Sequence, residues 1–170
     1  MPTRLFSDLK IKPKAIIFDL DCTLWPFDCD IYHGHKLQRK GDRVLDNHGD
    51  LVEPCPDSLA LLTDIHNEEG VFLAFFPDVA NRLVDVFGWR DLFDFIEIYP
   101  ASKTKHFNAI KNKSGVMFTE MIFFDDLEWN LREAESLGIQ AHLVHNGIYW
   151  DLVRHALVDY ERKHKTSNGH

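Results

Sequence analysis

Five short apolar runs alternate with segments of helical pattern along this chain, and this alternation limits the possible folds more than any other feature. Each run is rich in β-branched or aromatic side chains, which is typical of strands buried on both faces of a parallel sheet. Parallel strands need crossover connections, and the segments between the runs are long enough to be helices. The runs are residues 15–18, 71–76, 95–99, 121–124 and 141–144.

Turn residues and apolar spacing place helices in the intervening segments. Pro56 stands where a helix can start, and Gly70 stands where it can stop. The polar end of the chain, residues 165–170, is expected to fray. The predicted helices span about 56–70, 79–87, 103–113 and 127–137, and the first is expected to bury Leu59, Leu62, Ile65 and His66 on one face.

These elements predict an α/β fold: a Rossmann-like three-layer sandwich with a mainly parallel sheet and a ligand crevice at the carboxyl ends of the strands. A length of 170 residues and 45% apolar residues fit one globular domain over residues 1–170. A polar, His-rich stretch at about 26–54 is predicted to be a small cap-like insertion, with a possible short strand at 43–45.

Composition also limits the partners. A net charge of −8 argues against nucleic acid, because nucleic-acid binding depends on clustered Lys and Arg facing phosphates. We expect no membrane association, since no apolar stretch approaches the length of a bilayer span and the N-terminus lacks the apolar core of a signal peptide. The three cysteines lack disulfide-framework spacing, which predicts reduced thiols and a cytoplasmic location. We expect a monomer.

Polar clusters follow three of the predicted strands, at residues 19–23, 102–103 and 125–126. Side chains alternate along a strand, so Asp19 and Asp21 are expected on the same side. With Asp125 and Asp126 they would bring four carboxylates to one edge of the sheet, and these would repel one another without a cation. Oxygen-only ligation favours Mg²⁺.

The charges at this edge favour phosphoryl transfer. Four ionised carboxylates carry −4, whereas Mg²⁺ and Lys103 return +3, so protonating one carboxyl would restore the balance and create a general acid. One carboxylate would attack phosphorus and a second would protonate the departing oxygen. The residues leave another interpretation open, because an isolated lysine is usually a surface residue and paired acids often decorate a helix N-terminus.

Three strings in order resemble a known family. Residues 18–27 read FDLDCTLWPF, residues 97–103 read EIYPASK and residues 123–126 read FFDD. The first resembles the DxDx(T/V) signature of haloacid dehalogenase superfamily phosphatases, and the set is similar to the eukaryotic magnesium-dependent phosphatase 1 branch, from about Lys14 to Asp151.

The resemblance implies a Mg²⁺-dependent phosphatase that acts on phosphomonoesters, either small molecules or phosphoproteins. Family members act on phosphotyrosine-type substrates and on phosphorylated sugars attached to proteins. The resemblance assigns Asp19 as the nucleophile and Asp21 as the acid and base. It implies metal binding by Asp19, Asp125, Asp126 and the Asp21 carbonyl, and phosphate-side roles for Thr23, Ser102, Lys103 and the Asp78 amide, with Thr23 also orienting the loop of Asp21.

The chain departs from the family at the end of the second strand. Pro77 stands where the family has a Ser or Thr, so a hydroxyl and an N–H are missing there. One such lost donor costs about 10²–10³ in rate. Asp78 follows where Arg is usual, and its repulsion of phosphate is on the order of 3 kcal/mol at roughly 5 Å. The alternative is therefore a weak or inactive phosphatase-like protein with a binding or regulatory role.

Two further hypotheses concern the insertion and the residues beside it. A structural zinc site would need to gather dispersed cysteines and histidines, whose spacing is irregular. Trp25 and Phe27 are expected to be core or lid residues, or to line the substrate mouth. The zinc hypothesis involves Cys22, Cys29, His33, His35 and Cys55.

Overall fold

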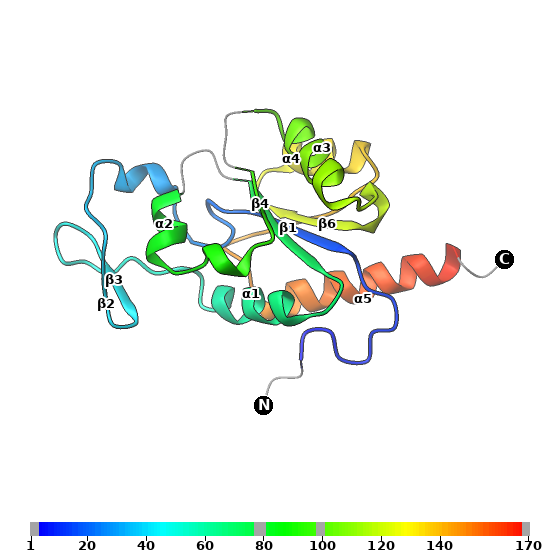
Figure 1. Ribbon diagram of the computed structural model, residues 1–170, viewed down its shortest axis with the longest axis horizontal. Helices are drawn as coiled ribbons and strands as arrows, with labels where there is room; N and C mark the ends of the chain where they lie inside the picture. Colours follow the sequence, from blue (N-terminus) through cyan, green and yellow to red (C-terminus); the bar gives the residue numbers. More distant parts are fainter. Residues whose placement is uncertain (1–3, 77–80, 98–100, 168–170) are drawn as a thin grey trace.

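A five-stranded parallel sheet lies at the centre of the protein, whose computed structural model describes residues 4–76, 81–97 and 101–167 (Figure 1). The strand order is β5-β4-β1-β6-β7, so β1 is the middle strand. The register pairs Asp19, at the end of β1, with Phe76 of β4. The strands are β1 (Ala15–Asp19), β4 (Phe72–Phe76), β5 (Phe95–Ile96), β6 (Met121–Asp125) and β7 (Gln140–Leu143).

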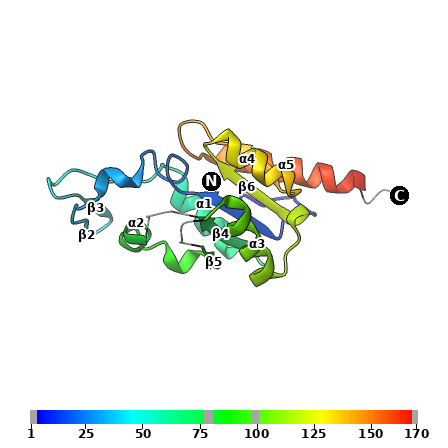
Figure 2. The ribbon, with the colours of Figure 1, turned by 90° about the horizontal axis from the view of Figure 1, so that it is seen from above.

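Helices cover both faces of the sheet, as Figures 1 and 2 show: α1 and α5 on one face, α3 and α4 on the other. Alternate residues of β1 pack into two separate cores, with Ile16 and Phe18 on the α1/α5 side and Ile17 on the α3/α4 side. The predicted three-layer α/β sandwich is confirmed. The helices are α1 (Ser58–Asn67), α2 (Asn81–Val86), α3 (Lys103–Ser114), α4 (Glu128–Ser136) and α5 (Trp150–Ser167), with 3-10 helices at Cys29–Tyr32, Arg90–Leu92 and Phe118–Glu120.

Two helical predictions were wrong. The buried face of α1 includes Leu61 together with Leu62 and Ile65, whereas Leu59 and His66 are exposed. The predicted and the observed buried faces of α1 are offset by one residue, so apolar spacing alone did not distinguish them. The end of the chain was expected to fray from Lys165 and no helix was predicted before it, but Lys165 lies inside α5, which buries Val153, Ala156, Leu157 and Tyr160.

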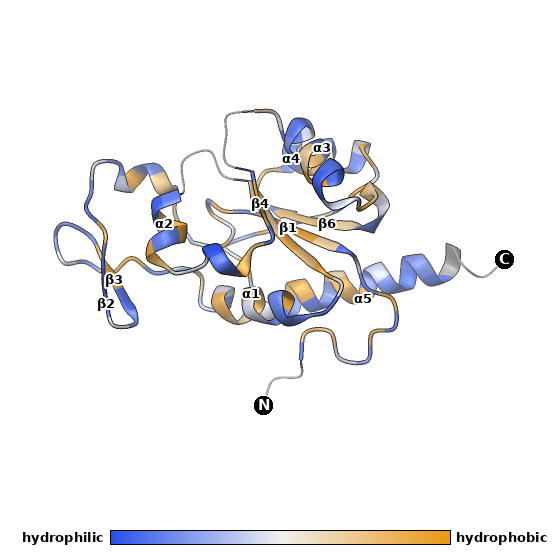
Figure 3. Cartoon of the chain, in the orientation of Figure 1, coloured by the Kyte–Doolittle hydropathy of each residue, from blue (hydrophilic) through white to orange (hydrophobic). Residues whose placement is uncertain are grey.

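The insertion contains an antiparallel hairpin that projects from the carboxyl-end side of the sheet (Figures 1 and 2). It is formed by β2 (Gln38–Lys40) and β3 (Arg43–Leu45), of which β3 was predicted. Val44 and Val52 are buried in the core that α1 and α5 share, so the insertion packs against the body of the protein. Figure 3 shows hydrophobic residues along the central strands. That the whole chain is one domain stays a prediction.

Within the described residues, no helix has both the length and the apolar character that crossing a bilayer requires. The thiols of Cys22, Cys29 and Cys55 are all free in this structure.

Candidate active site

Asp19 and Lys103 meet at the carboxyl edge of the sheet. Asp19 ends the middle strand, and Lys103 is the first residue of α3, whose N-cap Ser102 accepts a hydrogen bond from the Lys105 amide. The Lys103 Nζ lies 3.5 Å from the Asp19 Oδ1, and only 16% and 14% of the two side chains are exposed. This pair was predicted from sequence positions 84 residues apart.

Asp125 and Asp126 approach Asp19 from the end of β6. Asp125 is fully buried, and its carboxylate accepts hydrogen bonds from the Leu127 amide at 2.9 Å and from the Asn130 Nδ2 at 3.0 Å. Asp19, Asp125 and Asp126 each offer a carboxylate oxygen within 4.8 Å of the other two. The structure therefore brings together three of the four predicted carboxylates.

The environment of these carboxylates disfavours their ionised forms. Burial raises the pKa of Asp19 well above its usual value, and the neighbouring charge of Asp125 adds to the effect, whereas Lys103 opposes it. Burial also raises the pKa of Asp125 to about 6, although the hydrogen bond from Leu127 lowers it. A divalent cation would remove this penalty. The all-oxygen donor set fits Mg²⁺, which is commonly held by a few carboxylates together with water and substrate oxygens.

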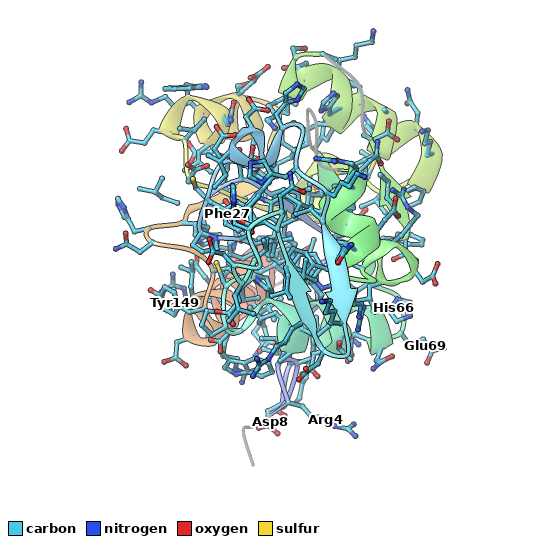
Figure 4. All side chains as sticks on the ribbon, turned by 90° about the vertical axis from the view of Figure 1, so that its left-hand side faces the viewer. Arg4, Asp8, Phe27, His66, Glu69 and Tyr149 are labelled. Carbon is cyan, nitrogen blue, oxygen red and sulfur yellow. The ribbon has the colours of Figure 1, made fainter. Side chains whose placement is uncertain are left out.

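Asp21 lies in the same cavity but points to different partners. Its carboxylate accepts hydrogen bonds from the Trp25 Nε1 at 2.7 Å and the Cys29 amide at 3.0 Å. Burial raises its pKa, which favours a protonated carboxyl that can act as an acid. Trp25 is itself fully buried and stacks on Phe27, labelled in Figure 4, with 5.9 Å between ring centroids. Metal binding by the Asp21 carbonyl stays a prediction.

One cavity of about 530 Å³ joins these groups. Asp19, Asp21, Ser102 and Lys103 all line it, so the predicted convergence of distant motifs is present. Its other lining residues are Cys22, Asp28, Ala101, Asp126, Leu127, Trp129, Asn130 and Glu133.

Thr23, one of the predicted phosphate-side residues, does not line this cavity. Thr23 is fully buried and its hydroxyl has no hydrogen-bond partner in the described part of the chain. Its carbonyl accepts hydrogen bonds from the Ile148 amide and the Cys55 thiol, so Thr23 braces the loop, and the structure does not support direct contact with phosphate. Asp78, like Pro77, lies outside the described residues.

Sequence reasoning missed Asn130, which orients Asp125, and Glu133, which accepts hydrogen bonds from the amide and hydroxyl of Thr104 and so ties α4 to α3. No helical spacing rule singled out Asn130, because it lies five residues after Asp125, which belongs to β6 and not to α4. The zinc hypothesis fails among the described residues, since the only metal-type group that includes any of its five candidates combines Cys29 with Asp21 and Asp28.

Comparisons with known proteins identify relatives of this chain. The profile of the acid phosphatase family matches residues 11–163. Magnesium-dependent phosphatase 1 of Homo sapiens is 33% identical over 141 residues, which is 80% of each chain. A haloacid dehalogenase-like hydrolase superfamily protein of Schizosaccharomyces pombe is 30% identical over 143 residues, covering 75% of this chain and 83% of that protein.

Solved structures agree on the fold. A magnesium complex of a haloacid dehalogenase family enzyme from Bacteroides thetaiotaomicron aligns with a TM-score of 0.55 at 18% identity, covering 82% of this chain and 96% of that one. L-2-haloacid dehalogenase from Xanthobacter autotrophicus aligns with a TM-score of 0.53 at 14% identity, over 78% and 77% of the two chains. From the family match and the two relatives, this chain belongs to the acid phosphatase family, within the haloacid dehalogenase superfamily, and is similar to magnesium-dependent phosphatase 1.

Proposed function

We propose that this protein is a Mg²⁺-dependent phosphomonoester hydrolase that uses Asp19 as its nucleophile. One observation carries the proposal: carboxylates from the ends of β1 and β6 share a cavity with the ammonium group of Lys103. Membership of the acid phosphatase family supports the same reaction.

The residues divide the reaction into two steps. In the first, an Asp19 oxygen forms a bond to phosphorus, the bond from phosphorus to the leaving oxygen breaks, and Asp21 gives its proton to that oxygen. In the second, the ionised Asp21 takes a proton from a water molecule that attacks the aspartyl phosphate, which releases phosphate and restores Asp19. Lys103 balances charge on the phosphoryl oxygens in both steps.

Asp19, Asp125 and Asp126 would hold Mg²⁺. When bound, the ion supplies positive charge that lowers the pKa of Asp19 and stabilises the phosphoryl oxygens. Without a cation, burial and the charge of Asp125 disfavour the ionised nucleophile. We therefore expect activity to depend on the metal.

The substrate classes are phosphotyrosine-type aryl phosphates and phosphorylated sugars on proteins, which we carry over from the family resemblance. The catalytic cavity is large enough for a phosphoryl group with an aromatic ring, and the indole of Trp129, 66% exposed, lines its wall. That aromatic wall supports an aryl leaving group. A cytoplasmic location and a monomeric state stay predictions.

The first experiment measures phosphate release from p-nitrophenyl phosphate with Mg²⁺ and with EDTA. Asp19→Asn should abolish turnover because the amide is a poor nucleophile, and Asp151→Asn, an exposed substitution on α5, should leave it unchanged. Wild-type turnover no higher than that of Asp19→Asn would refute the proposal. The binding or regulatory alternative rests on Pro77 and Asp78, so the double variant Pro77→Ser with Asp78→Arg should then gain activity.

A further inference from the structure

We infer that the groove between β2 and α2 docks an acidic, extended peptide segment of a phosphoprotein substrate; this rests on the phosphatase function proposed above. The groove has a volume of about 570 Å³. We call it the β2 groove, and its lining residues are Lys36, Leu37, Gln38, Arg82, Asp85 and Val86.

The hairpin beside the groove is strongly basic in an acidic protein. Residues 36–43 read KLQRKGDR, with four cations and one carboxylate, whereas the whole chain has a net charge of −8. Elsewhere in the described chain, Lys and Arg side chains form nine ion pairs with carboxylates. Within the same described residues, no carboxylate pairs with Lys36, Arg39, Lys40 or Arg43, and all four are exposed.

The groove combines this charge with an apolar floor. Leu37 and Val86 are half-buried, while Lys36 and Arg82 supply positive charge. The one acid in the lining, Asp85, is paired with Arg90 at 2.5 Å, and this hydrogen bond lowers its pKa. The lining therefore complements an anionic segment that also carries apolar side chains.

The shape of the site favours a peptide over other polyanions. Among the described residues β2 pairs only with β3, so its other edge is unpaired, and Gln38, the first residue of β2, lines the groove. An extended peptide can add a strand to such an edge through main-chain hydrogen bonds. Nucleic acid would require a broader basic surface, which a chain of this net charge does not offer.

The α2 wall of the groove connects to the catalytic edge through Arg82. Arg82 donates to the carbonyls of Tyr32 at 2.8 Å and His35 at 2.7 Å, which ties α2 to the 3-10 helix Cys29–Tyr32. The first residue of that 3-10 helix, Cys29, donates its amide to the Asp21 carboxylate. In Figure 1 the hairpin and α2 lie side by side, and Figure 4 views the molecule from the side on which the hairpin projects.

An acidic block four to eight residues from the phosphorylated residue would span about 13–26 Å at roughly 3.3 Å per residue. The test therefore uses tyrosine phosphopeptides with a Glu block at several separations in that range, and a Gln block at the same places as the neutral counterpart. Phosphate release gives kcat/KM for each peptide, and p-nitrophenyl phosphate reports the catalytic centre alone.

At low ionic strength the wild-type protein should have about tenfold higher kcat/KM for the best acidic peptide than for its Gln counterpart, through a lower KM. This preference should vanish in 1 M salt, where the Debye length is about 3 Å. Lys36→Glu with Lys40→Glu should remove the preference without changing p-nitrophenyl phosphate turnover. The control Lys165→Glu, on the distant end of α5, should retain it.

Equal kcat/KM for Glu and Gln peptides at every separation would overturn the inference while leaving the proposed function intact. A preference for Glu peptides that persists in the Lys36→Glu, Lys40→Glu variant would also overturn it, because the positive charge that recognises the peptide would then lie outside this hairpin. Heparin and anionic vesicles test for other partners. If the wild type binds either of them, the charge-reversal variant does not, and Glu and Gln peptides react equally, the surface recognises another class of partner and the inference is wrong. Loss of p-nitrophenyl phosphate turnover in the wild type would refute the proposed function instead.

Discussion

Replacing Asp125 with Asn should stabilise the metal-free protein while abolishing its activity. Asp125 is fully buried at the end of β6, and burial raises its pKa to about 6 from an ordinary 3.8. At 1.36 kcal/mol per pKa unit, that difference corresponds to about 3 kcal/mol by which the ionised carboxylate destabilises the fold at pH 7. An uncharged amide still offers an oxygen to the Leu127 N–H but loses the hydrogen bond from the Asn130 Nδ2, so we expect a gain of about 1–2 kcal/mol.

The sign of this effect depends on pH. Because the folded pKa lies above the unfolded one, the folded state binds more protons between about pH 4 and pH 6, and the free energy of unfolding falls as pH rises through that window. The advantage of Asp125→Asn should therefore be full at pH 7 and small at pH 4.

Urea unfolding in EDTA at these two pH values measures the effect. Mg²⁺ should then stabilise the wild type, because the folded state binds the ion, and should stabilise the variant much less. Asp151→Asn, exposed on α5, should change stability by less than about 0.5 kcal/mol. A variant no more stable than wild type in EDTA at pH 7, or an advantage independent of pH, would show that the buried charge is not the source of the penalty.

Three other substitutions probe the site and its support. Lys103→Ala should lower kcat/KM for p-nitrophenyl phosphate by about 10²–10³, because one donor to the phosphoryl oxygens is lost. Trp25→Phe keeps a ring but removes the donor to Asp21, so steady-state kinetics should show a larger loss for alkyl phosphates, whose leaving oxygen needs a proton, than for p-nitrophenyl phosphate. Gly147→Ala should destabilise the fold by more than about 1–2 kcal/mol in thermal unfolding, because φ is +88° and the added Cβ would lie 2.5 Å from the Cys55 Sγ. In a Cys55→Ala background the steric clash is removed, so only the backbone cost should remain.

The sheet was predictable because its strands are nearly uniform apolar runs. The runs at 15–18 and 121–124 are fully buried in β1 and β6, and the acids that follow them leave the sheet at the same edge. In a parallel sheet the carboxyl ends of all strands lie at one edge. Asp19, Lys103 and the acid pair could therefore be predicted to lie together from the sequence alone.

Side-chain direction was less predictable. Thr23 and Asp21 share a loop, yet the hydroxyl of Thr23 is buried away from the cavity and the carboxylate of Asp21 turns to Trp25 and Cys29. Cys22, between them, has φ of +58°, a left-handed conformation that breaks strand alternation. Asp19 and Asp21 precede Cys22 and line the same cavity, as the period-two rule predicts, whereas Thr23 follows Cys22 and does not line it.

The apolar strands also give the acids their chemistry. A pair such as Asp125-Asp126 on an exposed turn would be solvated and would have little affinity for a cation. Asp125 follows the buried run MIFF and is desolvated there. This desolvation raises its pKa and strengthens its attraction to a cation that binds nearby. Asp19 follows the buried run AIIF and is desolvated in the same way. The stability given up in the metal-free fold and the affinity for a divalent ion thus have one cause, which is the burial of carboxylates at the ends of the two central strands.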